Sequence, residues 1–124
     1  MARILVVDDS SFARLRICNL LQDAGHQTEE AENGRLGLAK VLAASPDCIV
    51  TDLLMPELDG IGLLKALREQ GLAVPVIVLT ADIQESRLRE CYDLGAKRFL
   101  SKPPQQKALL AALEQVLAGG EAQP

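Results

Sequence analysis

Four apolar, strand-like runs in this chain each end on a residue that can contact a phosphoryl group. Residues 4–7 are followed by Asp8 and Asp9, residues 48–51 by Asp52, residues 76–79 by Thr80, and residues 99–101 by Lys102. In an open parallel sheet the carboxyl ends of all strands lie along one edge, and ligands bind in the crevice there. The sequence therefore predicts that three carboxylates, a hydroxyl and an ammonium group meet in one crevice.

Such a crevice favours one kind of chemistry. Three neighbouring carboxylates repel one another, so without compensation the pKa of at least one of them rises. A hard divalent cation relieves this repulsion, and Mg²⁺ prefers oxygen ligands in octahedral geometry. A carboxylate is also a nucleophile that forms an acyl phosphate, and phosphoryl transfer mainly needs positioning and charge neutralisation. Lys102 can supply a compact positive charge, and Thr80 can supply a neutral hydroxyl donor.

Taken singly, each of these residues has an ordinary structural explanation. An aspartate at the end of a strand is more often a helix cap or a turn residue, and we interpret Asp59 in this way. Thr80 alone fits a β-branched strand residue, and Lys102 alone fits a solvated surface charge. Their joint occurrence at the carboxyl edge of one predicted sheet is what favours a functional site.

Helical and strand patterns alternate along the whole chain. The expected strands are residues 4–7, 27–31, 48–51, 76–80 and 98–101, and the expected helices begin near residues 11, 34, 61, 83 and 104. Right-handed crossovers then give a doubly wound, flavodoxin-like α/β fold of five βα units, with a parallel sheet in the strand order 2-1-3-4-5. We expect residues 1–118 to form this one domain, and residues 119–124 to be a short polar tail or linker stub.

The helices carry more detailed expectations. The first helix has an apolar run at helical spacing, formed by Phe12, Leu15, Cys18 and Leu21. The second helix is expected to bury a stripe formed by Leu38, Val41 and Leu42. Asn33 is expected to cap the second helix, and Pro104 fits the first turn of the last one. Asp82 with Glu85 resembles a capping box before the fourth helix.

Composition argues against other function classes. A net charge of −4 and the absence of Trp disfavour nucleic-acid binding. Three cysteines, far apart in sequence, fit buried apolar positions in a reducing compartment, and a single histidine, His26, argues against zinc or copper. No signal peptide precedes the first strand and no apolar run could span a bilayer, so we expect a soluble, cytoplasmic protein.

With these residues in view, the chain resembles a response-regulator receiver domain of the chemotaxis-regulator type, the phosphoacceptor of two-component signalling. The resemblance spans roughly residues 3–117 and depends on the motifs ILVVDDS, PDCIVTDLLMPELDG, VIVLTA and LGAKRFLSKP. It implies that Asp52 is phosphorylated. It implies a Mg²⁺ site formed by Asp8, Asp9, Asp52 and the backbone carbonyl of Leu54.

The resemblance also implies contacts to the phosphoryl group and a two-state switch. Thr80 and Lys102 would contact the phosphoryl oxygens, and the Lys102–Pro103 peptide bond would be cis. On phosphorylation Thr80 moves inward and the ring of Phe99 follows, as a local charge change biases a bistable packing. Burial in the ordinary core is the competing explanation for Phe99, which stands where chemotaxis regulators often have tyrosine.

The implied partners are a sensor histidine kinase or phosphotransfer protein as donor, and a downstream protein target. The target would bind a face built from the fourth helix, the fifth strand and the fifth helix. Candidate residues of this face are Arg87, Cys91, Tyr92, Lys97, Phe99 and Lys107. Leu54 and Asp82 lie near the expected path of the hydrolytic water, although Leu54 could simply shield the loop and Asp82 could simply cap a helix.

By this resemblance the chain is an enzyme only in catalysing its own phosphorylation and dephosphorylation. The alternative is a Mg²⁺-dependent aspartyl-phosphate phosphatase or phosphotransferase of the haloacid-dehalogenase type. That family has its nucleophile after the first strand and a second aspartate two positions later, whereas Asp8 and Asp9 are adjacent and no cap insertion follows. Flavin binding on a similarly wound sheet is a third possibility, but the phosphate loop and an aromatic platform are lacking.

Overall fold

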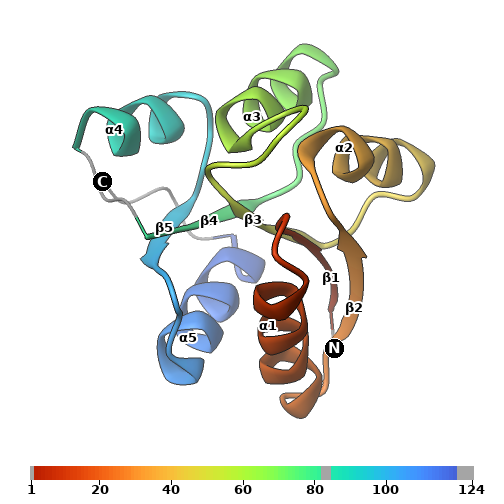
Figure 1. Ribbon diagram of the computed structural model, residues 1–124, viewed down its shortest axis with the longest axis vertical. Helices are drawn as coiled ribbons and strands as arrows, with labels where there is room; N and C mark the ends of the chain where they lie inside the picture. The colour runs from red at the N-terminus through yellow and green to blue at the C-terminus, as the bar shows by residue number, and fades with distance from the viewer. Residues whose placement is uncertain (1, 82–84, 120–124) are drawn as a thin grey trace.

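A five-stranded parallel sheet forms the middle layer of the molecule (Figure 1). The computed structural model describes residues 2–81 and 85–119. The strands are β1 (Arg3–Val7), β2 (Gln27–Ala31), β3 (Cys48–Asp52), β4 (Val76–Thr80) and β5 (Arg98–Ser101). They pair in the order β2-β1-β3-β4-β5, and each pairing is parallel. The predicted fold class and strand order are confirmed.

Helices cover both faces of this sheet. They are α1 (Ser11–Asp23), α2 (Gly34–Ala43), α3 (Gly60–Glu69), α4 (Glu85–Asp93) and α5 (Gln106–Leu117). Figure 1 shows α1 and α5 together on one face, and α2, α3 and α4 on the other. From β1 the chain adds β2 on one side and then β3, β4 and β5 on the other, so the strand order reverses between β1 and β3. Doubly wound folds bind ligands at this point.

Burial on both faces explains why the central strands are almost entirely apolar. Successive side chains of a strand point to opposite faces, so Ile4 and Val6 pack beneath α1 and α5, while Leu5 and Val7 pack beneath the other three helices. The edge strand β2 is polar, with only Ala31 fully buried. The core thus fixes the register of β1 against β3, and with it the positions of the residues that follow each strand.

The predicted helix caps are confirmed where the structure describes them. The Asn33 side-chain oxygen accepts a hydrogen bond from the Leu36 N–H at 2.8 Å, and Asp59 Oδ1 accepts one from the Gly62 N–H at 2.7 Å. Each bond satisfies a backbone donor that the first helical turn leaves unpaired. Asp82 lies outside the described residues.

The apolar run predicted for α1 is only partly buried. Phe12 is 79% exposed and Leu15 is 57% exposed, whereas Ile17, Cys18 and Leu21 are buried. Three residues turn a helix by about 300°, so a run spaced strictly by threes drifts by about 60° at each step. Phe12 and Leu21 consequently lie on opposite sides of α1.

The second helix packs on the sheet through a glycine rather than through all its predicted leucines. Val41 is buried and Leu38 is partly buried, but Leu42 is 54% exposed, so the predicted stripe is wrong at Leu42. Gly37 shares the buried face with Val41, and a Cβ at Gly37 would lie 3.1 Å from Val7 Cγ2. This small face brings α2 close to β1, while Leu42, about 100° further around the helix, points to solvent.

The last helix begins later than predicted. Pro104 was expected in its first turn but is buried in the segment that links β5 to α5. Gln105 is the N-cap, with extended backbone angles (φ −78°, ψ 141°), so α5 starts at Gln106. An N-cap residue has non-helical angles, which excludes a helical turn before it.

All three cysteines are free and buried, as predicted. Burial raises the pKa of Cys48 to about 12 and that of Cys91 to about 11, so both remain neutral thiols. No helix in residues 2–81 or 85–119 is long and apolar enough to cross a membrane.

Candidate functional site

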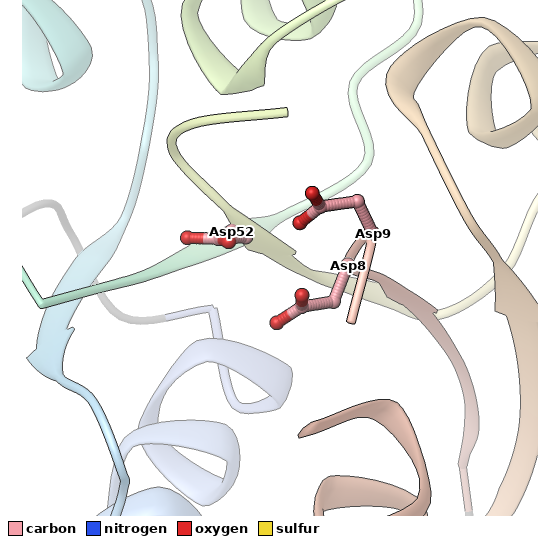
Figure 2. A group of neighbouring side chains, drawn as sticks. All are labelled: Asp8, Asp9 and Asp52. Carbon is pink, nitrogen blue, oxygen red and sulfur yellow. The ribbon is translucent and has the colours of Figure 1, made fainter. Parts of the chain in front are cut away.

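Three carboxylates converge at the carboxyl ends of β1 and β3, as Figure 2 shows. β1 pairs with β3 so that Val7 lies opposite Thr51. Asp8 and Asp52 each come next along their strands, and this register brings them together. One carboxylate oxygen from each of Asp8, Asp9 and Asp52 lies within 4.8 Å of the others. The predicted convergence of these three acids is therefore observed.

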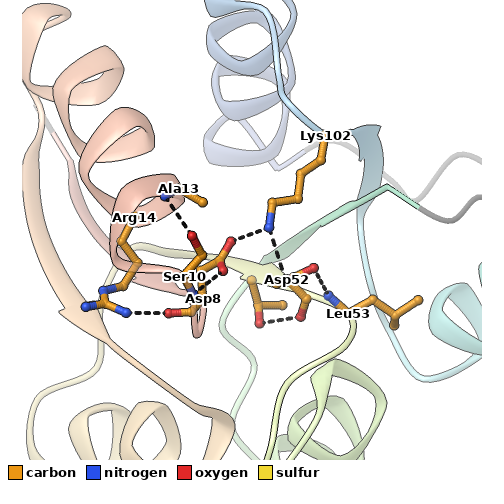
Figure 3. A network of polar contacts seen from close by, with 8 residues as sticks. Asp8, Ser10, Ala13, Arg14, Asp52, Leu53 and Lys102 are labelled. Carbon is orange, nitrogen blue, oxygen red and sulfur yellow. Dashed lines mark hydrogen bonds and ion pairs between the residues drawn. The ribbon is translucent and has the colours of Figure 1, made fainter.

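Two of the three carboxylates are largely shielded from solvent and share one ammonium group. The Asp8 side chain is only 1% exposed and that of Asp52 only 12% exposed, whereas Asp9 is exposed. Lys102, which follows β5, contacts both shielded acids: its Nζ lies 2.6 Å from Asp8 Oδ2 and 3.2 Å from Asp52 Oδ2 (Figure 3). A residue distant in sequence thus supplies the positive charge that the sequence pattern predicted.

Backbone N–H groups orient the other carboxylate oxygen of Asp8 and of Asp52. The Ser10 N–H donates to Asp8 Oδ1 at 2.9 Å, and the Leu53 N–H donates to Asp52 Oδ1 at 2.8 Å. The Ser10 hydroxyl in turn accepts a hydrogen bond from the Ala13 N–H at 3.2 Å and caps α1 (Figure 3). The start of α1 therefore fixes the rotamer of Asp8.

The electrostatic balance of the site is negative. Burial and the neighbouring charge of Asp8 raise the pKa of Asp52 above its ordinary value, and they outweigh the opposing effect of Lys102. Burial lowers the pKa of Lys102, but its hydrogen bond to Asp8 and the charges of Asp52 and Asp8 outweigh that effect, so its pKa rises and it stays charged. One ammonium group thus faces three carboxylates, and a further positive charge would relieve the excess.

The donor set is suited to a hard cation. All three convergent ligand atoms are carboxylate oxygens, and within residues 2–81 and 85–119 no nitrogen or sulfur ligand belongs to the group. Such oxygen donors match Mg²⁺, which usually takes one or two carboxylates and keeps several waters. Leu54 lies two residues after Asp52 in the loop that follows β3.

Thr80 ends β4 at the same edge of the sheet. It is 1% exposed, and it lies in register with Ser101 of β5. The Lys102 N–H donates to the Thr80 backbone oxygen at 2.9 Å, so the two residues are adjacent in space. The Lys102–Pro103 peptide bond is cis, as the resemblance implied.

The predicted partner face is only partly on the surface. Phe99 is partly buried and packs against the core beneath α2, α3 and α4; its ring centroid lies 6.4 Å from that of Tyr92. Cys91 is completely buried, so its assignment to this face is wrong. The buried side of α4 includes Cys91, because its small apolar side chain packs against the sheet.

Sequence reasoning missed Arg14. Its Nη1 donates to the Asp8 backbone oxygen at 2.6 Å (Figure 3), and its Nε lies 3.1 Å from a carboxylate oxygen of Glu30. Arg14 therefore ties the backbone of the acidic segment to the edge strand β2. A basic residue in the first turn of a helix is disfavoured by the helix dipole, and that could have indicated a tertiary partner.

Comparisons with known proteins agree with this geometry. The family model described as the response regulator receiver domain matches residues 4–114. Protein PilH of Pseudomonas aeruginosa is 37% identical over 121 residues, which cover 96% of this chain and 100% of PilH. Chemotaxis protein CheY of Bacillus subtilis is 37% identical over 116 residues, covering 93% of this chain and 97% of that protein. The solved structure of Vibrio cholerae chemotaxis protein CheY4 is 37% identical with a TM-score of 0.87, covering 94% and 98% of the two chains.

The chain belongs to the response regulator receiver-domain family, the class of domain used in two-component signalling. The fold, the acidic cluster and these relatives agree on this assignment. It is favoured over the haloacid-dehalogenase alternative, whose spaced pair of aspartates would not match the adjacent Asp8 and Asp9.

Proposed function

We propose that the protein is a signalling switch that is activated by phosphorylation of Asp52. One observation carries the proposal: the Asp52 carboxylate lies beside Asp8, Asp9 and the Lys102 ammonium at the carboxyl edge of the sheet. In this arrangement a nucleophilic oxygen lies beside one ammonium group and beside two carboxylates that could hold a cation, and these positive charges would neutralise a phosphoryl group. Residues 1–118 would form the receiver domain, and residues 119–124 a short polar tail or linker stub.

Asp8, Asp9, Asp52 and the backbone carbonyl of Leu54 would hold Mg²⁺. When bound, the ion neutralises charge on the carboxylates and on the phosphoryl oxygens. The fit follows from the chemistry of the donors, since three carboxylate oxygens within 4.8 Å of one another form a hard, negatively charged site.

The chain's own residues account for the transfer step. A carboxylate oxygen of Asp52 attacks the phosphorus, and the bond from phosphorus to the nitrogen or oxygen of the donor breaks. The donor leaves with the electron pair. The Lys102 ammonium stabilises the charge that spreads over the phosphoryl oxygens, and the Thr80 hydroxyl donates a hydrogen bond to one of them. Catalysis is limited to the chain's own phosphorylation and dephosphorylation.

Phosphorylation would then change the surface near β5. Thr80 moves toward the phosphoryl group, and Phe99 follows into the space behind it, which alters its contact with Tyr92. A downstream protein target binds the changed face of α4, β5 and α5, and a histidine kinase or phosphotransfer protein is the donor. Tyr92 is the only tyrosine and the chain has no Trp, so tyrosine fluorescence would report on changes in the surroundings of Tyr92, which include the ring of Phe99.

Intact mass after incubation with Mg²⁺ and acetyl phosphate tests the proposal. We expect wild type to gain the mass of one phosphoryl group, and Asp52→Asn to gain none. Asp59→Asn is the matched control, because Asp59 caps α3 outside the cluster and Asn caps a helix equally well. It should be phosphorylated like wild type.

Two results would contradict this proposal. One is a phosphorylated Asp52→Asn variant, which would place the acceptor elsewhere. The other is rapid multiple turnover of unrelated phosphate esters by wild type, which would favour a dedicated phosphatase.

A further inference from the structure

The loop between β3 and α3 turns at a residue with an unusual backbone conformation. Glu57 has φ 66°, and among residues 2–81 and 85–119 it is the one non-glycine residue with positive φ. The Leu58 N–H donates to the Pro56 backbone oxygen at 2.8 Å, and this hydrogen bond closes a three-residue turn with Glu57 at its centre. This is the bonding pattern of the rare, strained γ-turn. Strained conformations of this kind persist only where the surroundings enforce them.

The start of α2 supplies the groups that hold Glu57. Glu57 Oε2 accepts hydrogen bonds from Asn33 Nδ2 at 3.0 Å and from Arg35 Nε at 3.3 Å. Asn33 is buried, and its other amide atom, Oδ1, accepts from the Leu36 N–H. One side-chain amide therefore caps α2 and anchors the loop at the same time.

The two hydrogen-bond donors to Glu57 differ in how much they contribute to holding its side chain. The side chains of Arg35 and Glu57 are more than half exposed, and exposed ion pairs contribute little to stability. The Asn33 donor is buried, and an unpaired buried amide is costly. The hydrogen bond from Asn33 is thus the main constraint on the Glu57 side chain.

Backbone contacts hold the loop on both sides of Leu54. The Gly34 N–H donates to the Leu58 oxygen at 3.0 Å, and a Cβ at Gly34 would lie 2.2 Å from that oxygen. The Gly60 N–H donates to the Leu53 oxygen at 2.8 Å. The loop is therefore held at its beginning and at its end by backbone hydrogen bonds, and between them by the hydrogen bond from Asn33 to the Glu57 side chain.

We propose that Glu57, held by Asn33, is a positioning residue for the metal site. It locks the β3–α3 loop in the conformation in which Leu54 can offer its carbonyl to the cation. This inference depends on the proposed function, because it assigns a second task to the same metal site. Groups that orient metal ligands commonly change metal affinity by about 10-fold to 100-fold when they are removed.

Two substitutions at Glu57 separate positioning from charge and from folding. Glu57→Gly removes the side chain and also relieves the backbone strain, whereas Glu57→Gln makes the same charge change but keeps an oxygen acceptor for Asn33. By calorimetric titration with Mg²⁺ we expect Glu57→Gly to bind about tenfold more weakly than Glu57→Gln. Glu57→Gly relieves the backbone strain but leaves the buried Asn33 amide without this acceptor, so the unfolding temperatures of both variants are measured as well. Titration well below both unfolding temperatures ensures that lost affinity does not reflect lost folding.

A reciprocal exchange provides a rescue test. Asn33→Asp keeps the helix cap but loses the amide donor and sets a carboxylate against Glu57, so we expect weaker Mg²⁺ binding. Adding Glu57→Gln restores a hydrogen bond with donor and acceptor exchanged, and the net charge equals that of wild type. The double variant should recover most of the affinity lost in Asn33→Asp.

The outcomes distinguish this inference from the proposed function. Equal Mg²⁺ affinity in Glu57→Gly and Glu57→Gln overturns the positioning role alone, if wild type binds Mg²⁺ and is phosphorylated. Failure of the double variant to recover affinity also overturns it. A wild-type protein that binds no Mg²⁺ overturns the positioning role and the proposed function together.

Discussion

The two ends of β1 carry ion pairs of nearly equal length in very different surroundings. At the amino end, Arg3 Nη2 lies 2.5 Å from Glu29 Oε1, and both side chains are at least 40% exposed. At the carboxyl end, Lys102 Nζ lies 2.6 Å from Asp8 Oδ2, and that carboxylate is almost completely buried. Distance alone would rank the two pairs as equals.

Burial and charge balance separate them. The exposed pair is neutral overall and is screened by water, so it needs no further partner. The buried pair belongs to a group of three carboxylates and one ammonium, and burial together with the neighbouring charge of Asp8 raises the pKa of Asp52. Buried, unbalanced charge therefore distinguishes the carboxyl end of β1, where we propose the metal site, from its amino end.

Removing the ammonium at the buried end should have the largest effect. Lys102→Met leaves the phosphoryl oxygens without their cationic partner, and we expect phosphorylation by acetyl phosphate to slow by about 10²–10³-fold. Time-resolved intact mass measures the rate. Arg3→Met removes a cation at the other end of the same sheet and should leave the rate unchanged; an equal loss in both variants would show a general effect of charge.

Removing one buried carboxylate should weaken metal binding. Asp8→Asn deletes a proposed Mg²⁺ ligand, and we expect an affinity more than about tenfold lower in calorimetric titration. Glu29→Gln makes the same charge change at the exposed pair and is the matched control. Mg²⁺ affinity unchanged in Asp8→Asn would contradict the assignment of this ligand.

The raised pKa of Asp52 predicts that ionisation of Asp52 lowers the free energy of unfolding of the metal-free protein. Above its ordinary pKa of 3.8 the unfolded chain releases this proton, while the folded chain retains it to higher pH. The free energy of unfolding therefore falls as pH rises through this range, and the cost persists at neutral pH. In EDTA, Asp52→Asn should be more stable than wild type at neutral pH, and the difference should shrink as pH falls below the ordinary value. Thermal unfolding of both proteins measured against pH would check this. A stability advantage of Asp52→Asn that grows toward low pH would contradict the prediction.

The exposed pair should show the smallest effect. Replacing Arg3 and Glu29 by Ala, singly and together, gives a double-mutant cycle, and we expect a coupling energy below about 1 kcal/mol that decreases with added salt. Urea unfolding measures it. The same cycle for Lys102 and Asp8 provides the comparison. Equal coupling energies for the two pairs would remove the distinction between the two ends of β1.

The sheet and its acidic edge could be predicted because both depend on local features. Parallel central strands are buried on both faces, so they appear as unbroken apolar runs, and the residue after each run is placed at the edge by topology alone. Asp8, Asp52 and Lys102 were identified in this way. Their exact partners follow from register, which the core fixes.

The helix faces were harder to predict because they depend on what each helix packs against. Phe12 and Leu15 were grouped with buried residues by a spacing of three that does not stay on one face. Leu42 was expected in the core, but α2 approaches the sheet through Gly37, which a hydrophobic pattern does not count. The hydrogen bond between Asn33 and Glu57 joins two loops, and neither residue type signals it in sequence.

Thermal unfolding of wild type and Asp52→Asn, with and without Mg²⁺ at neutral pH, tests the central claim most directly. Without the ion, Asp52→Asn should be the more stable protein, because it lacks a carboxylate whose charge is disfavoured by partial burial and by the neighbouring Asp8. With saturating Mg²⁺ the order should reverse, because the ion stabilises the folded state that binds it more tightly. If Mg²⁺ leaves the difference between the two proteins unchanged, the carboxylates are not a metal site and the account is wrong.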